Sequence, residues 1–84
     1  MKELELLKNR IKYRSSYRGT KEMDILLSSF AKAIVENLSL NELKALNRFM
    51  NFNDEDIYAL YQNNKPIQNF KNKKILELFK NFKI

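Results

Sequence analysis

The sequence has no cysteine and no histidine among its 84 residues. Without cysteine the chain can form neither a disulfide nor a thiolate metal site. Without histidine it lacks the commonest general base, the commonest zinc ligand and the usual activator of a serine or cysteine nucleophile. These absences exclude most classes of catalytic site, and we expect a protein that is not itself an enzyme and holds no metal.

Glycine and proline each occur once, as Gly19 and Pro66. A single glycine excludes a glycine-rich phosphate-binding loop. No stretch approaches the ~20 apolar residues of a membrane span. The first five residues, MKELE, contain two acids and no apolar run, so they resemble neither a secretory signal nor an organelle presequence. We therefore expect no membrane insertion and a location in the bacterial cytoplasm.

Hydrophobic residues make up 44% of the chain, and most of them recur three or four positions apart, which predicts helices. Thr20, Ser39 with Glu42, and Asn53 are typical residues for helix starts. The expected helices cover about residues 2–17, 21–37 and 40–51, a stretch from 53–56 to about 63, and 67–82. The sequence thus predicts an all-α fold, a compact five-helix bundle, with residues 1–84 as a single domain.

The net charge of +6 is unevenly distributed. Residues 1–21 carry +5, residues 22–64 carry −4 and residues 65–84 carry +5. Such asymmetry is compatible with nucleic acid, an anionic surface or an acidic protein partner. A small basic helical nucleic-acid-binding protein is the alternative interpretation. Because the acidic middle interrupts any continuous basic stripe, we expect no nucleic acid as partner.

The corner between the first two expected helices contains the most unusual group of residues. Arg14 and Arg18 continue the apolar stripe of the first helix, and Arg10, Arg14 and Arg18 recur every four residues, which predicts one ridge. The ridge has two interpretations: arginines lying over a neighbouring helix with their charged ends in water, or a row of guanidinium groups that faces a partner. Gly19 is expected to end the helix with a positive φ.

Glu22 and Asp24 lie in the first turn of the second expected helix, where negative charge suits the helix dipole. Their carboxylates also offer hydrogen-bond acceptors to a partner. Arginines are typical anchors of protein interfaces. The predicted partner-binding residues are Arg10, Arg14, Arg18, Gly19, Glu22 and Asp24.

Arg18-Gly19-x-x-Glu22 resembles the RGxxE signature of the succinate dehydrogenase flavinylation factors, small assembly proteins of bacteria and mitochondria. The similarity extends over residues 10–31, RIKYRSSYRGTKEMDILLSSFA, which resemble the family's first two helices. Further matches follow in family order at residues 38–42, 54–58 and 65–66. The chain departs from the family pattern in two ways. Leu60 stands where a tryptophan is usual, and Ser16-Tyr17 stands where many bacterial relatives carry a Trp-His or Arg pair.

The resemblance implies a five-helix fold and a role in assembly. Proteins of this family bind the flavoprotein subunit of succinate dehydrogenase, and in some bacteria that of fumarate reductase, and promote covalent attachment of FAD to a histidine of that subunit. It implies a monomer that forms a transient heterodimer and keeps no cofactor stably bound. Our hypothesis is that the arginine ridge and the Arg18-Gly19/Glu22 corner dock near the flavin site and hold the partner's domains in a reactive geometry.

Overall fold

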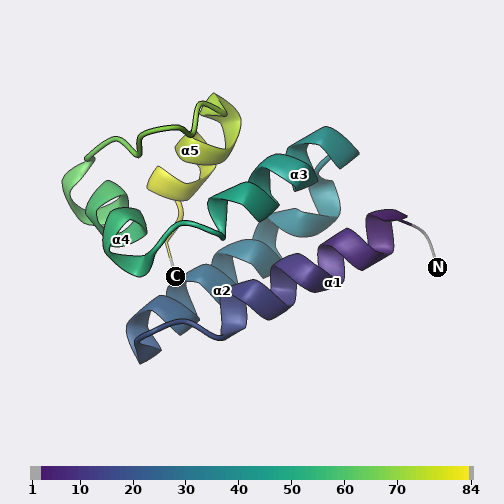
Figure 1. The fold of residues 1–84 in the computed structure, drawn as a ribbon, viewed down its shortest axis with the longest axis horizontal. Coiled ribbons are helices and arrows are strands. Elements are labelled where there is room, and N and C mark those ends of the chain that lie inside the picture. Colours follow the sequence, from purple (N-terminus) through teal and green to yellow (C-terminus); the bar gives the residue numbers. More distant parts are fainter. Residues whose placement is uncertain (1–2, 84) are drawn as a thin grey trace.

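The computed structural model describes residues 3–83, which form five α-helices and one short 3-10 turn (Figure 1). The helices are α1 (Glu3–Ser16), α2 (Lys21–Ile34), α3 (Leu40–Phe49), α4 (Asp54–Asn63) and α5 (Lys73–Lys80), and the turn η1 (Val35–Asn37) extends α2. This confirms the predicted all-α fold with five helices. Residue 2, where the first helix was expected to begin, lies outside the described residues.

Side chains at the helix starts explain where three of the helices begin. The Thr20 hydroxyl accepts a hydrogen bond from the Met23 N–H at 3.2 Å at the start of α2. Ser39 and Glu42 form a reciprocal capping box at the start of α3. The Asn53 side chain accepts a hydrogen bond from the Asp56 N–H at 2.8 Å at the start of α4. The structure confirms these three predicted starts. They could be predicted from the sequence because a cap depends on residues only a few positions apart.

The fifth helix is much shorter than the predicted range of 67–82. Asn69 has a φ of 68°, in the left-handed region, which a helix does not tolerate. The Asn72 side chain then accepts a hydrogen bond from the Ile75 N–H at 3.0 Å and begins α5. Ile67 and Phe70 are nevertheless buried, because they anchor a non-helical segment on the core. Their helical spacing was therefore misleading.

The core is centred on three phenylalanines that are fully buried, Phe30 from α2, Phe49 from α3 and Phe79 from α5. The ring centroids of Phe30 and Phe79 lie 5.0 Å apart and those of Phe49 and Phe79 lie 5.1 Å apart, both edge to face. Figure 1 shows α1 alongside α2, with α4 and α5 together on the other side of the molecule. Among residues 3–83, no helix combines the length and apolar character needed to cross a bilayer.

Among the ion pairs that connect elements distant in the sequence, two join a lysine to a glutamate at 2.8 Å. Lys8 Nζ lies 2.8 Å from Glu36 Oε1, and Lys74 Nζ lies 2.8 Å from Glu42 Oε2. The hydrogen bonds from these lysines hold the pKa of each glutamate below its usual value. A lowered folded-state pKa contributes stability above the unfolded-state pKa of glutamate, and that contribution is lost as the pH falls through the folded-state pKa.

The start of α5 can be tested by a substitution at Asn72. Its effect on the free energy of unfolding has opposite signs for the observed helix and for the predicted helix over residues 67–82. We expect Asn72→Ala to lower the free energy of unfolding by about 1 kcal/mol, because it removes a helix cap. If the helix began at residue 67, Asn72 would be an interior position, and alanine there would stabilise the protein. Urea unfolding measures the difference, with Gln68→Ala, at an exposed position of the same segment, as the control.

Candidate functional site

The side chain of Arg18 is directed into the protein, and only 9% of it is exposed. Its Nε donates a hydrogen bond to Asp54 Oδ1 at 2.8 Å. Its Nη1 donates to the carbonyl oxygens of Met50, at 2.8 Å, and Arg14, at 3.3 Å, and Nη2 donates to that of Phe52 at 2.9 Å. The guanidinium therefore joins the turn between α1 and α2 to the segment between α3 and α4.

Gly19 contacts the same carboxylate from its backbone. The Gly19 N–H donates to Asp54 Oδ2 at 2.7 Å, so both oxygens of Asp54 are used by the turn. The backbone N–H of Arg18 donates to Asp24 Oδ1. We call this group, Arg18, Gly19, Asp24 and Asp54, the Arg18 corner.

The expectation of a positive φ at Gly19 is wrong, because no glycine in the chain has one. The structure gives a different reason for glycine at this position. A Cβ atom would lie 3.0 Å from Asp54 Oδ2, closer than almost all ordinary contacts of a methyl group with oxygen. The carboxylate has little freedom to move away, since Arg18 and the Gly19 N–H hold both of its oxygens. The glycine lets the chain's own carboxylate approach the backbone.

The predicted ridge of three arginines is divided. Helix α1 ends at Ser16, so Arg18 lies beyond it, in the turn. The buried face of α1 continues from Ile11 to Ser15 instead of passing through the arginines. Arg14 is exposed and donates a hydrogen bond to the Asn51 side chain, next to the end of α3. The interpretation of a single guanidinium row therefore fails because the helix stops before the third arginine.

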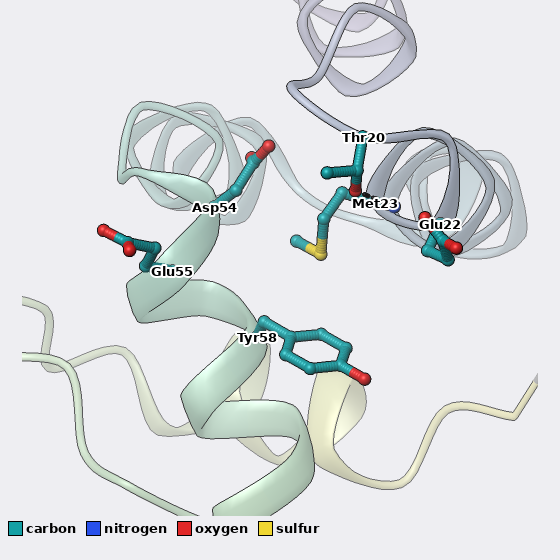
Figure 2. Close-up of a pocket in the computed structure, with 6 residues that line it drawn as sticks. All are labelled: Thr20, Glu22, Met23, Asp54, Glu55 and Tyr58. Carbon is teal, nitrogen blue, oxygen red and sulfur yellow. Dashed lines mark hydrogen bonds between the residues drawn. The ribbon is translucent and has the colours of Figure 1, made fainter.

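Glu22 lies on the rim of an open hollow of about 360 Å³ between α2 and α4. Figure 2 shows Met23 and Tyr58 pointing into the space between the two helices, with carboxylates around its edge. Glu22 is exposed and makes no hydrogen bond or ion pair within residues 3–83. The lining residues are Thr20, Glu22, Met23, Asp54, Glu55 and Tyr58.

The six predicted site residues thus fall into separate environments. Arg18, Gly19 and Asp24 are held in the Arg18 corner, whereas Glu22, Arg10 and Arg14 are exposed to solvent. The sequence indicated Asn53 as the start of the fourth helix but not the contacts that Asp54 makes with the turn. No local signal reveals them, because Arg18 and Asp54 are 36 residues apart. No group of acidic residues in the described part of the chain could hold a metal ion.

A protein-family model described as flavinator of succinate dehydrogenase matches residues 9–83, a range that contains the Arg18 corner. The chain belongs to this family. It is 33% identical over 81 residues to succinate dehydrogenase assembly factor 2, mitochondrial, of Danio rerio, covering 94% of this chain and 51% of the relative. The corresponding protein of Debaryomyces hansenii is 34% identical over 79 residues, covering 89% and 56%. Assembly factor 2-A of Drosophila persimilis is 35% identical over 79 residues, covering 92% and 49%.

The chain spans about half the length of these relatives. The relatives are eukaryotic and are named as mitochondrial proteins, which points to mitochondria. The expectation of a bacterial cytoplasmic location is therefore wrong. No solved structure matches the chain.

The contacts of Arg18 predict a structural effect of its removal. We expect Arg18→Ala to lower the free energy of unfolding by about 2–4 kcal/mol, because it leaves the half-buried Asp54 carboxylate and enclosed carbonyls without their donors. Arg10→Ala is the matched control, since Arg10 is exposed, and it is expected to change stability by less than about 0.5 kcal/mol. Equal melting temperatures for the two variants would contradict the structural role of Arg18.

The close approach at Gly19 predicts coupling between two positions. Gly19→Ala is expected to destabilise the protein by about 1 kcal/mol, because the new methyl group crowds the Asp54 carboxylate. In an Asp54→Ala background the crowding is gone, and we expect the same change to be neutral or to stabilise by up to about 1 kcal/mol through the unfolded state. A double-mutant cycle by urea unfolding measures the coupling, and strict additivity would refute the close-contact explanation.

Proposed function

We propose that this chain is an assembly factor that binds the flavoprotein subunit of succinate dehydrogenase and promotes covalent attachment of FAD to that subunit. The observation that carries the proposal is the match of the flavinator family model to residues 9–83. The names of the relatives, which are succinate dehydrogenase assembly factors, support it. In a cell that makes fumarate reductase, its flavoprotein subunit is a second candidate partner.

The geometry suggests which signature residues contact the partner and which ones support the contact surface. Arg18 and Gly19 fix the turn through Asp54, and the same turn leads into α2, where Glu22 remains exposed. In the proposal the partner contacts Glu22, while Arg18, Gly19 and Asp24 position the surface that carries it. Arg10 and Arg14 extend the contact along α1. An exposed carboxylate without an internal partner can accept hydrogen bonds from a partner's cationic or N–H donors.

The proposed contribution to flavin attachment is positioning. Holding the domains of the flavoprotein subunit in the geometry in which its histidine attacks the flavin avoids the entropy cost of finding that arrangement. FAD supplies the reactive carbon, and it is bound by the partner subunit. The chain itself acts without catalysis and without a stably bound cofactor, as a monomer that forms a transient heterodimer. No feature of the described residues favours the nucleic-acid alternative.

A reconstitution tests the proposal. The apo flavoprotein subunit is mixed with FAD, with and without this protein, and covalent flavin is read by its fluorescence in a denaturing gel. We expect stimulation by the wild-type protein and a loss of about tenfold or more for Glu22→Gln, which keeps the side-chain size but removes the charge. The melting temperature of Glu22→Gln should stay within about 1–2 °C of wild type, because Glu22 makes no internal contact.

Glu77→Gln is the matched control, since Glu77 is exposed on α5 and is not among the residues that line the hollow. It should stimulate flavin attachment as the wild type does. Absence of stimulation by the wild-type protein would refute the assembly-factor proposal. Full stimulation by Glu22→Gln would refute only the assigned role of Glu22.

A further inference from the structure

A second hollow, of about 340 Å³, lies between α1 and α3. We call it the α1–α3 groove. Its α1 side lies toward the N-terminal end of that helix, whereas the Arg18 corner follows the helix's C-terminal end. The lining residues are Glu3, Leu6, Leu7 and Arg10 from α1 and Lys44 and Asn47 from α3.

The groove has two basic side chains without internal partners. Arg10 and Lys44 make no hydrogen bond and no ion pair within residues 3–83, whereas Lys8 and Lys74 are each paired with a glutamate at 2.8 Å. One helical turn further along each helix stand two more exposed arginines, Arg14 on α1 and Arg48 on α3. Glu3 is the one acid among the groove's lining residues. The surface is therefore complementary to an anionic ligand.

The α1–α3 groove also contains an exposed leucine and an asparagine amide oxygen without a hydrogen-bond donor. Leu6 is 53% exposed, although it is a large apolar side chain. The Asn47 Oδ1 atom is enclosed and has no hydrogen-bond partner in the described part of the chain. An enclosed acceptor without a donor is unfavourable, and the terminal torsion of asparagine is soft enough to turn the amide toward a ligand. The groove thus offers an acceptor for an N–H and an apolar contact beside its two cations.

We infer that the α1–α3 groove binds an extended acidic segment of the flavoprotein subunit. The inference rests on the proposed function, because that subunit is the partner. Carboxylates of the segment pair with Arg10 and Lys44, a backbone N–H donates to the Asn47 amide oxygen, and an apolar side chain covers Leu6. Binding here adds a second contact area to the one around Glu22.

A peptide fits these features better than a nucleic acid does. The sugar–phosphate backbone of DNA carries acceptors but no N–H donor for the Asn47 oxygen, and it gains nothing from an exposed leucine. Glu3 repels phosphates and carboxylates alike, so the groove suits a ligand with a few separated charges beside Arg10 and Lys44 better than a continuous run of phosphates. A protein segment provides carboxylates, backbone N–H groups and apolar side chains together.

The first test measures the affinity of the purified flavoprotein subunit for charge-reversal variants. We expect Arg10→Glu and Lys44→Glu each to weaken binding about threefold to tenfold at low salt, and the difference to shrink as salt is added. Lys32→Glu makes the same charge change at an exposed position of α2 that does not line the groove, and it should weaken binding less than twofold. Circular dichroism and melting temperature check that each variant is folded.

The outcomes separate the two proposals. If the wild-type protein neither binds the subunit nor stimulates flavin attachment, the proposed function has failed. If the wild type does both and the Arg10 and Lys44 variants bind as tightly as Lys32→Glu, the groove inference and the contact assigned to Arg10 are overturned, whereas the assembly-factor role stands. It is also overturned if the groove variants lose binding to a labelled oligonucleotide while their binding to the subunit is unchanged.

The second test identifies the bound segment. Because the chain has no cysteine, Leu6→Cys can be labelled uniquely with a benzophenone maleimide and cross-linked to the subunit by light. We expect mass spectrometry to find the label on one peptide of the subunit that contains at least two Asp or Glu residues. Ala33→Cys, at an exposed position of α2, is the control and should not label that peptide. Labelling of a peptide without acids, or no cross-link from position 6, would overturn the inference.

Discussion

The interaction between Arg18 and Asp54 organises the part of the molecule that carries the family signature. It connects the turn after α1 to the first residue of α4. The guanidinium also donates hydrogen bonds to the carbonyl oxygens of Met50 and Phe52, in the segment between α3 and α4. Such a largely buried charge is favourable only when its donors find acceptors, and the Arg18 guanidinium makes four hydrogen bonds. Together with the hydrogen bonds from the Arg18 and Gly19 backbone N–H groups, this pair holds the turn from which α2 begins.

The signature residues therefore divide into a supporting group and an exposed one. Arg18 and Gly19 use their donors inside the chain, which leaves Glu22 as the member of RGxxE whose side chain is exposed and without an internal partner. A rigid support beneath an exposed contact residue reduces the ordering cost of binding. In the proposed function, the motif serves an interface through Glu22, while two of its three defining residues bind the protein's own backbone and side chains.

The charges of the two hollows are opposite. The hollow between α2 and α4 is edged by carboxylates, whereas the charged residues of the α1–α3 groove are two cations and one acid. The two hollows lie toward opposite ends of α1. The α1–α3 groove is lined by the N-terminal part of α1, and the α2–α4 hollow adjoins the turn that follows α1. Opposite potentials at two contact areas fix the orientation of a partner more strongly than a single charged patch does. For a factor proposed to act by positioning, orientation matters more than affinity.

The sequence by itself determined the five helices and most of their starts, because hydrophobic periodicity and caps such as Ser39 with Glu42 depend on residues within a few positions of each other. It also indicated the family through the ordered motifs around Gly19. The sequence missed that α5 begins after Asn72, because Ile67 and Phe70 keep a helical spacing although they are buried outside a helix. Only the tertiary structure decided that Gly19 is needed for the approach of Asp54 and that Arg18 is directed inward. The reason is that a contact between residues 36 positions apart leaves no periodic or local trace in the chain.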